Sequence, residues 1–444
     1  MTMTTEVAEI CSTLIRMDTT NPGSGERKAA EYVAGLLDEV GIEPTVVESA
    51  PQRTNVLARI PGDGTDPHAL LIHGHLDVVP ADASEWRLHP FSGEVEDGCV
   101  HGRGAVDMKG TLSMTLTAVR DWARRGVRPK RDIVLAFVAD EEATGEYGAG
   151  YVVDEHRDWF ADCTEAISES GGFSWHQGDT RIYPVAVGER GTAWMRLTAK
   201  GVAGHGSKPA ADNPVVELSR ALVRIAEYRW PVRLTPAVAT LVEGLSQALG
   251  TTIDLDRLDE EIERLPQAAM LFKGVLRNSA NPTMLDAGYK VNVIPGTAHA
   301  HVDGRFLPGY RDEFLETIDR LLGPKVTREF VSMGDAVSSP AEGLFDELRA
   351  ALLAEDPTGH PVPYVMTGGT DAKAFAQIGI RGYGFAPLLL PPGLNYFGMF
   401  HGVDERVPVE GLEFGVRVLD RLLLAGDARD GAEDGTEDGA TGER

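Results

Sequence analysis

The sequence predicts an α/β protein in which a mixed sheet is flanked by helices, with a smaller α+β unit inserted into it. Helical and strand-like apolar segments alternate through residues 1–188. A different order of elements occupies residues 189–335, and the first pattern resumes over 336–425. A chain of 444 residues exceeds what one hydrophobic core usually organises, so we expect two domains; 42% hydrophobic residues suffice to fill both.

The first part begins with two helices, expected over 7–15 and 30–40 because apolar residues recur there at helical spacing. Turn residues at 19–23 separate them, and Gly41 ends the second helix. Strands are expected at 45–48, 55–60, 69–72 and 133–139, and a further helix at 108–125. The strand at 133–139 is apolar throughout, which indicates a parallel or mixed sheet with helices on both faces.

The inserted unit is predicted from the order strand, helix, two strands, helix and strand. These elements are expected at 192–200, 214–226, 287–293, 298–305, 311–322 and 325–331. The order is that of a ferredoxin-like domain, interrupted by an insertion from about 231 to 276. The last elements are expected at 344–353, 364–366, near Asp371 and at 412–424. Residues 426–444 lack large apolar side chains and are expected to form a disordered acidic tail.

Composition narrows the possible partners. Lys and Arg are outnumbered by Asp and Glu, 42 to 68, giving a net charge of −26, which argues against nucleic acid or an anionic membrane as a partner. The three cysteines are far apart and fit a reducing compartment. Because neither a secretory signal nor a stretch long enough to span a bilayer is evident, we expect a cytoplasmic protein.

Imidazole and carboxylate groups follow apolar strands or glycine-rich turns at several points. They are His75, Asp77, Asp107, Glu141, Glu142, Glu169 and His401. All could project from one edge of one sheet, where open α/β folds hold their ligands. Carboxylates gathered there repel one another unless they are protonated or bridged by cations, and a mixed imidazole and carboxylate set suits zinc, manganese or cobalt more than calcium. The set predicts a site for two metal ions with one bridging carboxylate and one free glutamate.

In their order and spacing these motifs resemble the M20 family of metal-dependent peptidases and amidohydrolases, which includes aminoacylases, carboxypeptidases and desuccinylases. The resemblance covers nearly all of residues 5–425. It implies a zinc-exopeptidase-like fold with an inserted lid and dimerisation domain. It also implies that two divalent ions, most simply zinc with cobalt or manganese as alternatives, are bound by two triplets: His75, Asp107 and Glu142, and Asp107, Glu169 and His401.

The resemblance also assigns roles in catalysis. Glu141 is the implied general base acting on a metal-activated water, and Asp77 is implied to orient His75 by accepting its second ring N–H. A cis peptide bond is implied between Asp107 and Met108. These roles predict hydrolysis of an amide or peptide bond.

Further residues are implied to meet the substrate. His205 resembles the histidine that crosses a dimer interface to stabilise the tetrahedral intermediate, which makes a homodimer part of the expected mechanism. Asn292 and Arg305 match the family's anchors for a substrate carboxylate, and Gly369 and Thr370 match a turn that lines the pocket. The expected substrate is an N-acyl amino acid or a short peptide with a free carboxylate.

Other interpretations remain open. The chain could be a non-catalytic metal-binding or metabolite-binding relative, although the presence of Glu141 beside a complete ligand set favours catalysis. Within the enzymes, dipeptidase or carboxypeptidase and desuccinylase activities compete with aminoacylase activity. His73 is expected to stack beside the site, and His299 and His301 are expected to form an exposed pair on a strand. None of these three histidines is therefore expected to bind metal.

Overall fold

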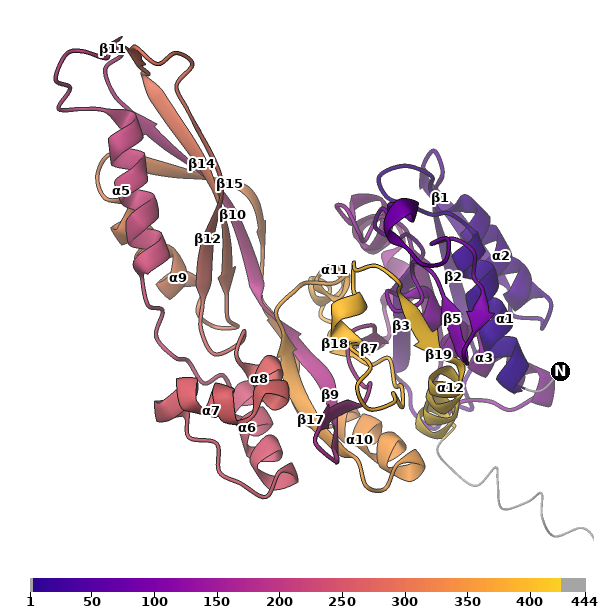
Figure 1. Ribbon diagram of the computed structural model, residues 1–444. Coiled ribbons are helices and arrows are strands. Elements are labelled where there is room, and N and C mark those ends of the chain that lie inside the picture. Colours follow the sequence, from indigo (N-terminus) through magenta and orange to yellow (C-terminus); the bar gives the residue numbers. More distant parts are fainter. Residues whose placement is uncertain (1–2, 425–444) are drawn as a thin grey trace, which may run out of the picture.

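The computed structural model describes residues 3–424, which form a large body and a projecting arm (Figure 1). The expected tail at 426–444 lies outside these residues. The body contains the large sheet and the metal-ligand candidates, and the arm corresponds to the inserted unit. Within the described residues, no helix is both long and apolar enough to cross a membrane.

The large sheet is mixed, as predicted. Its strands are β1 (Pro44–Ala50), β2 (Arg53–Ile60), β3 (Ala69–His75), β6 (Ile133–Val138), β7 (Cys163–Ser168), β8 (Trp175–Gln177), β9 (Thr180–Glu189), β16 (Val337–Ser338), β17 (His360–Met366) and β18 (Arg381–Gly384). They run in the order β1-β2-β6-β3-β7-β18-β9-β16, with β17 and β8 also paired to β9. The central strands β6, β3, β7 and β18 are parallel, so their carboxyl ends meet at one edge.

Helices cover both faces of this sheet. One face packs against α1 (Met3–Arg16), α2 (Arg27–Asp38), α3 (Lys109–Arg125), α10 (Leu344–Glu355) and α12 (Val409–Leu423). The other packs against α4 (Tyr151–Glu155) and α11 (Ala372–Ala376). Alternate residues of β3 enter the two cores, Leu70 on one side and Leu71 on the other. This explains why β3 and β6 are buried along their whole length and largely apolar.

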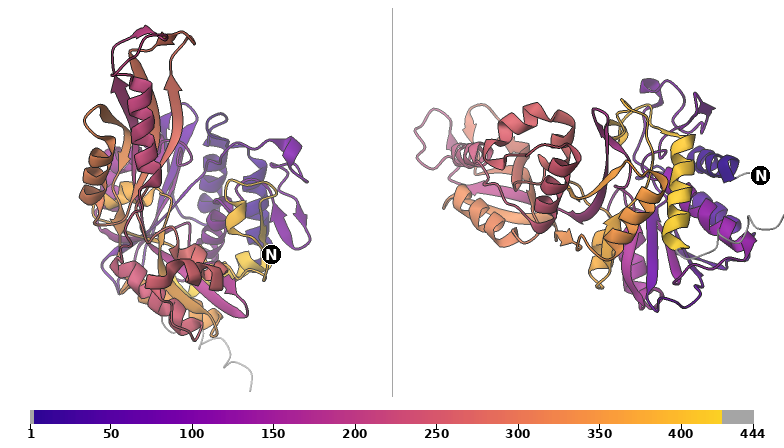
Figure 2. Two further views of the ribbon diagram at one scale, coloured as in Figure 1. Left: turned by 60° about the vertical axis from the view of Figure 1, so that its left-hand side comes forward. Right: turned by 90° about the horizontal axis from the view of Figure 1, so that it is seen from below.

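The arm, here called the lid, has the ferredoxin-like order of strands. Its strands are β10 (Gly191–Lys200), β12 (Ser279–Ala287), β14 (Thr297–Phe306) and β15 (Val326–Gly334), and its helices are α5 (Pro214–Glu227) and α9 (Arg311–Leu322). The strands run in the order β12-β14-β10-β15. Both helices pack on one face of this sheet, and in the view from below the lid lies to one side of the body (Figure 2, right).

One lid strand was misplaced in the sequence prediction. The strand expected at 287–293 is β12, Ser279–Ala287, which pairs with β14 from Ser279 opposite Arg305 to Ala287 opposite Ala298. Most of β12 is exposed at the edge of the sheet, so no apolar alternation marks it. The position of β12 is set by its pairing register with β14 and not by burial of its side chains.

The helices of the insertion expected at 231–276 pack on the body, while Arg233 near its start pairs with Glu313 of α9 in the lid at 3.1 Å. It contains α6 (Pro236–Ala248), α7 (Leu258–Arg264) and α8 (Pro266–Phe272), which lie below the lid in Figure 1. Val238, Leu241 and Phe272 belong to the same buried cluster as Val362 and Tyr364 of β17. Residues 236–272 are therefore part of the body's core.

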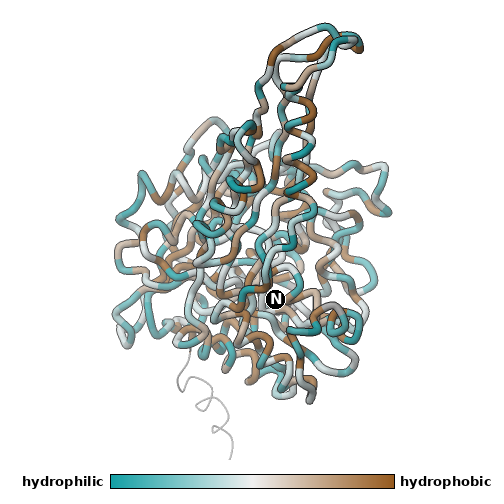
Figure 3. The backbone as a smooth tube through the Cα atoms, turned by 90° about the vertical axis from the view of Figure 1, so that its left-hand side faces the viewer, coloured by the Kyte–Doolittle hydropathy of each residue, from teal (hydrophilic) through white to brown (hydrophobic). Residues whose placement is uncertain are grey.

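Two small sheets complete the described structure. β4 (Val95–Glu96), β5 (Cys99–His101) and β19 (Arg406–Pro408) form one beside α12, and β11 (Gly204–His205) pairs with β13 (Val293–Ile294) at the tip of the lid. Hydrophobic positions recur along the lid up to this tip (Figure 3). Val202 and Val291 near the tip, and Met284 and Leu285 along β12, are exposed.

Candidate metal centre and substrate cavity

The ligand candidates meet at the carboxyl edge of the large sheet. His75 is the last residue of β3, Glu169 directly follows β7, and Glu142 lies in the loop after β6. Asp107 comes from the loop before α3, and His401 from the loop before β19. The sheet thus brings together groups from five separate segments.

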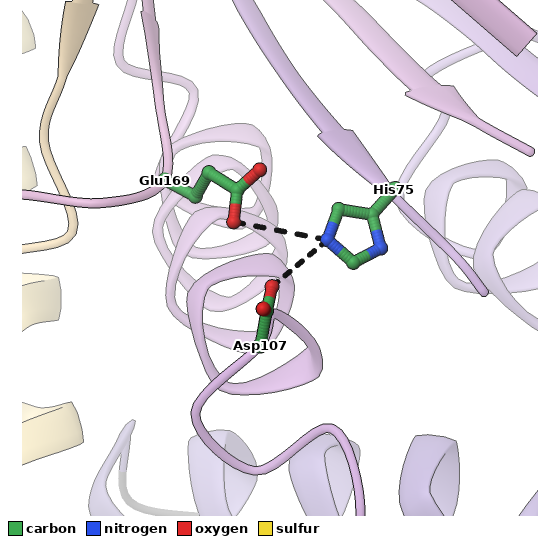
Figure 4. Close-up of side chains that lie close together, drawn as sticks. All are labelled: His75, Asp107 and Glu169. Carbon is green, nitrogen blue, oxygen red and sulfur yellow. Dashed lines mark hydrogen bonds and ion pairs between the residues drawn. The ribbon is translucent and has the colours of Figure 1, made fainter. Parts of the chain in front are cut away.

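Two groups of ligand atoms share Asp107. In the first, Nε2 of His75 lies 3.0 Å from Oδ1 of Asp107 and 3.7 Å from Oε2 of Glu169 (Figure 4). In the second, Nε2 of His401 lies 3.4 Å from Oδ2 of Asp107 and 3.1 Å from Oε2 of Glu142. Within each group the donor atoms lie within 4.8 Å of one another. Asp107 therefore offers one oxygen to each group, as a bridging carboxylate does.

The grouping differs from the one that the resemblance implied. Glu169 was expected with His401, and Glu142 with His75, but the two glutamates exchange places. Glu169 directly follows β7, the neighbour of β3, and so stays beside His75. Glu142 lies four residues beyond the end of β6 at Val138, far enough to reach the His401 loop.

The site gathers negative charge without enough positive charge to balance it. Burial, followed by the charge of Glu169, raises the pKa of Glu141 well above its usual range. Burial, followed by the charge of Asp107, raises the pKa of Glu169 to about 8. Oε1 of Glu142 is buried without a hydrogen-bond partner. Carboxylates in this state fit divalent cations, and the two imidazoles favour zinc, manganese or cobalt over calcium.

Asp77 supports the site in two ways. Its backbone carbonyl, 2.9 Å from Nδ1 of His75, accepts the second ring N–H, whereas its carboxylate lies 3.6 Å away. The carboxylate instead accepts the backbone N–H groups of Glu141 and Glu142, at 3.2 and 3.1 Å. The expected orientation of His75 is therefore provided by the backbone of Asp77, and the side chain holds the loop that bears Glu141. The peptide bond between Asp107 and Met108 is cis, which confirms that expectation.

Asn21 is a site residue that the sequence analysis did not identify. It is buried, and its Nδ2 donates to Oδ2 of Asp77 at 2.8 Å and to Oδ1 of Asp140 at 3.0 Å. Its Oδ1 accepts from Arg53 at 2.7 Å, which fixes the orientation of the amide. The sequence marked residues 19–23 only as a turn. Nothing in that turn indicated that Asn21 would contact Asp77, which lies 56 residues further along the chain.

Glu405 is a second site residue that was not identified from the sequence. Its fully buried carboxylate accepts the guanidinium of Arg103 at 2.7 Å and the backbone N–H groups of Gly104, Val106 and Asp107 at 3.1, 2.6 and 3.0 Å. Glu405 thus clamps the loop that carries the bridging aspartate. Its position four residues after His401 was the available signal in the sequence.

A cavity of about 310 Å³ opens beside the two groups. All the ligand candidates except His75 line it together with Glu141. Residues 367–370 and aromatic side chains, among them Phe173, Phe397 and Phe400, complete the lining. Gly369 and Thr370 thus lie where a pocket turn was expected. Thr370 is held by Glu189, whose carboxylate accepts its backbone N–H at 3.0 Å.

The other candidate substrate residues lie outside this cavity. His205 and Asn292 are exposed at the tip of the lid, where Gly206 donates its N–H to the carbonyl of Asn292 at 2.9 Å. Arg305, at the base of the lid, pairs with Asp303 at 2.7 Å. Within one chain, the structure therefore separates His205 and Asn292 from the metal groups.

Of the other histidines considered in the sequence, His73 stacks on an aromatic ring as expected, whereas His299 and His301 are half-buried and not exposed. His73 is buried, and its ring packs against Phe375 with centroids 4.7 Å apart. His299 and His301 are half-buried on β14, where His299 contacts the hydroxyl of Thr198 at 3.1 Å. Across residues 3–424, no third group of ligand atoms is brought together.

A mixed α/β sheet whose strand ends hold two imidazole and carboxylate groups around a shared aspartate defines the class of dinuclear metal-binding hydrolases. The chain belongs to peptidase family M20/M25/M40, whose sequence profile matches residues 71–425. It is therefore an enzyme of this family of hydrolases, which confirms the resemblance and the predicted fold class.

Curated relatives span most of the chain. Aminoacylase-1 of Sus scrofa is 27% identical over 430 residues, covering 93% of each protein. N-fatty-acyl-amino acid synthase/hydrolase PM20D1 of Homo sapiens is 27% identical over 383 residues, covering 82% of this chain and 76% of the human protein. Probable carboxypeptidase S-like 2 of Dictyostelium discoideum is 26% identical over 366 residues, covering 77% and 68%. The three relatives are thus named as an aminoacylase, an N-fatty-acyl-amino acid synthase/hydrolase and a probable carboxypeptidase.

Solved structures share the fold. An M20 family metallo-carboxypeptidase from Sulfolobus solfataricus aligns with a TM-score of 0.69 at 20% identity, covering 94% of this chain and 98% of that one. The di-peptidase Dug1p from Saccharomyces cerevisiae aligns with a TM-score of 0.67 at 17% identity, covering 95% and 97%. A dinuclear metal-binding M20 peptidase from Bacillus subtilis aligns with a TM-score of 0.61 at 15% identity, covering 95% and 97%.

Proposed function

We propose that this enzyme hydrolyses the amide bond of an N-acyl amino acid or a short peptide that carries a free carboxylate. The observation that carries the proposal is Glu141, which lines the cavity beside the two groups joined by Asp107 but belongs to neither. The names of aminoacylase-1 and the carboxypeptidase and dipeptidase relatives support the same class of bond. Two divalent ions, most simply zinc with cobalt or manganese as alternatives, fit the donor set.

Bound divalent ions would polarise the substrate carbonyl and lower the pKa of water. Glu141 then accepts the proton of the attacking water at its carboxylate and delivers it to the nitrogen of the leaving amine. Asp77 keeps Glu141 in place by accepting its backbone N–H at 3.2 Å. The buried surroundings of Glu141 favour a carboxylate that takes up a proton readily.

We further propose that a homodimer completes the site. His205, and Asn292 beside it, would reach the partner's cavity and stabilise the tetrahedral intermediate and the substrate carboxylate, with Arg305 as a second anchor for that carboxylate. The exposed position of His205 and the exposed apolar residues around it support an interface at the lid. Gly369 and Thr370 would line the same pocket.

The test is a panel of N-acyl amino acids and dipeptides, combined with metal analysis of the purified protein. Metal-loaded protein should hydrolyse members of the panel, and Glu141→Gln should lose about 10³-fold or more in kcat while retaining its metal, since the removed group acts in proton transfer. Full activity of Glu141→Gln would exclude it as the base. Failure of the metal-loaded wild type on every amide would instead favour a non-catalytic metal-binding protein.

A further inference from the structure

One side of the cavity is a supported aromatic surface, here called the aromatic wall and defined as Phe173, Phe397 and Phe400. Phe397 packs edge to face on Phe173 with ring centroids 5.1 Å apart. Trp175 packs behind Phe397 at 4.8 Å, also edge to face. Phe173 is buried and the other two rings are half-buried, so the wall is held from behind and open toward the cavity.

The aromatic wall is adjacent in sequence to the candidate metal ligands. Phe400 directly precedes His401, and Phe173 lies four residues after Glu169. The carbonyl carbon of a substrate must lie at the metal groups for hydrolysis to occur. With the carboxylate of the amino acid held by the lid, as proposed above, the acyl substituent on that carbon is the part of the substrate left to face the wall.

The charges around the cavity exclude an acidic group at this position. Among the described residues that line the cavity there is no lysine or arginine, whereas Asp107, Glu141, Glu142 and Glu169 all do so. The nearby amine of Lys373 is engaged with the carbonyl of Arg190 at 2.8 Å. The proposed divalent ions would be held by the ligand candidates and the substrate carbonyl, so a carboxylate on the acyl group would find neither a lysine nor an arginine among the described lining residues to pair with.

We propose that the aromatic wall binds the acyl group of the substrate and selects uncharged hydrocarbon acyl groups of medium length. This inference rests on the proposed amide hydrolysis and decides among its substrates. It favours N-acyl amino acids with an apolar acyl group over succinylated substrates and over dipeptides with a free amino terminus. The carboxylate of the amino acid is bound by residues of the lid.

The wall predicts a dependence on acyl length. Each methylene group buried against it should raise kcat/KM about fourfold until the cavity is filled. An N-hexanoyl amino acid should therefore exceed the N-acetyl compound by at least about tenfold, with the N-succinyl compound below both. A metal-loaded Glu141→Gln protein, which does not turn the substrate over, should bind the compounds in the same order by calorimetry.

Substitution of Phe397 tests the wall itself. Phe397→Ser should reduce the hexanoyl-to-acetyl ratio by about fivefold or more while N-acetyl hydrolysis continues, and Phe397→Leu should keep most of the ratio. Phe91→Ser is the matched control, because Phe91 is also half-buried but does not line the cavity. Persistent hydrolysis of the acetyl substrate reports that the variants are folded.

Three outcomes would overturn the inference. These are an unchanged ratio in Phe397→Ser, a wild-type preference for succinyl compounds or free dipeptides, and a change that follows the amino acid side chain and not the acyl group. Absence of all amide hydrolysis would instead contradict the proposed function. The calorimetric order of binding to Glu141→Gln would still report on the wall in that case.

Discussion

Asn21 shows how a single uncharged residue can order a strongly acidic site. Its amide donates to Asp77 and Asp140, two carboxylates that would otherwise repel each other across a buried space. Asp77 in turn accepts the backbone N–H of Glu141. The position of the proposed base thus depends on a turn near the amino terminus.

Replacing this amide should impair turnover more than binding. We expect Asn21→Ala to lower kcat by about 10- to 100-fold with little change in KM or metal content, because groups that orient ligands have effects of this size. Steady-state kinetics and metal analysis measure this split. Asn278→Ala is the control, since Asn278 is equally buried and accepts a backbone N–H from Leu307, and neither residue is a ligand candidate or lines the cavity. Similar kinetic losses in both variants would show a general effect on folding.

Glu405 should act on the affinity for metal. Its two carboxylate oxygens accept hydrogen bonds from N–H groups of Arg103, Gly104, Val106 and Asp107. A glutamine in its place has only one acceptor oxygen, and its NH₂ group would face some of these N–H donors. We expect Glu405→Gln to weaken metal binding by about 10- to 100-fold in chelator competition. Asp404→Asn, a change one residue earlier, should bind metal as the wild type does. Unaltered affinity in Glu405→Gln would refute the role of the clamp.

At this scale the sequence predicted which residues gather at the centre, because each ligand candidate follows an apolar strand or a distinctive turn. It did not predict how Glu142 and Glu169 divide between the groups, since loop length beyond a strand end decides that. The contacts of Asn21 and Glu405 span 56 and 298 residues. Contacts between residues so far apart in the chain form only when the sheet has folded, and they leave no pattern in the nearby sequence.

Among the elements, those with a buried face were predicted well. β3 and β6 are buried throughout, and largely apolar, because helices cover both faces of the sheet. β12 was displaced because an exposed edge strand has no burial pattern. The packing of α6 and α8 on the body could not be predicted, since an apolar helix face does not specify which surface it will meet.

The junction of α10 with β9 makes a testable contribution to stability. Asp356, after the end of α10, accepts two hydrogen bonds from Arg181 and one from Tyr183, and the Arg181 contact, opposed by burial, holds its pKa below the usual range. We expect Asp356→Asn to lower the free energy of unfolding by about 2 kcal/mol at pH 7. Asp335→Asn, in the exposed pair with Arg311, should cost much less.

The effect of Asp356 should depend on pH in one direction. A carboxylate with a depressed pKa in the folded protein contributes fully above its unfolded pKa of about 3.9 and loses the contribution as pH falls further. The difference between wild type and Asp356→Asn should therefore be constant from pH 7 to about 5 and shrink below about 4. Denaturant titrations across this range measure it, and a difference that grows in acid would contradict the assignment.

In the whole molecule, the lid carries His205 and Asn292 away from the cavity of its own chain. If His205 acts on the partner, mixing His205→Ala with Glu141→Gln should restore activity, because each mixed dimer then has one complete site. Random pairing of equal amounts predicts about a quarter of wild-type activity. Each variant alone should remain nearly inactive, and a mixture no more active than its components would argue against action in trans.

The clamp of Glu405 on the Asp107 loop also has a consequence for biosynthesis. A ribosome releases the chain from its amino terminus, so His75, Asp107, Glu142 and Glu169 emerge long before residues 401–405. Until then the backbone N–H of Asp107 lacks its acceptor, the carboxylate of Glu405. The second group of ligand atoms also lacks the imidazole of His401. Binding of an ion by the second group would accordingly have to await the emergence of residues 401–405.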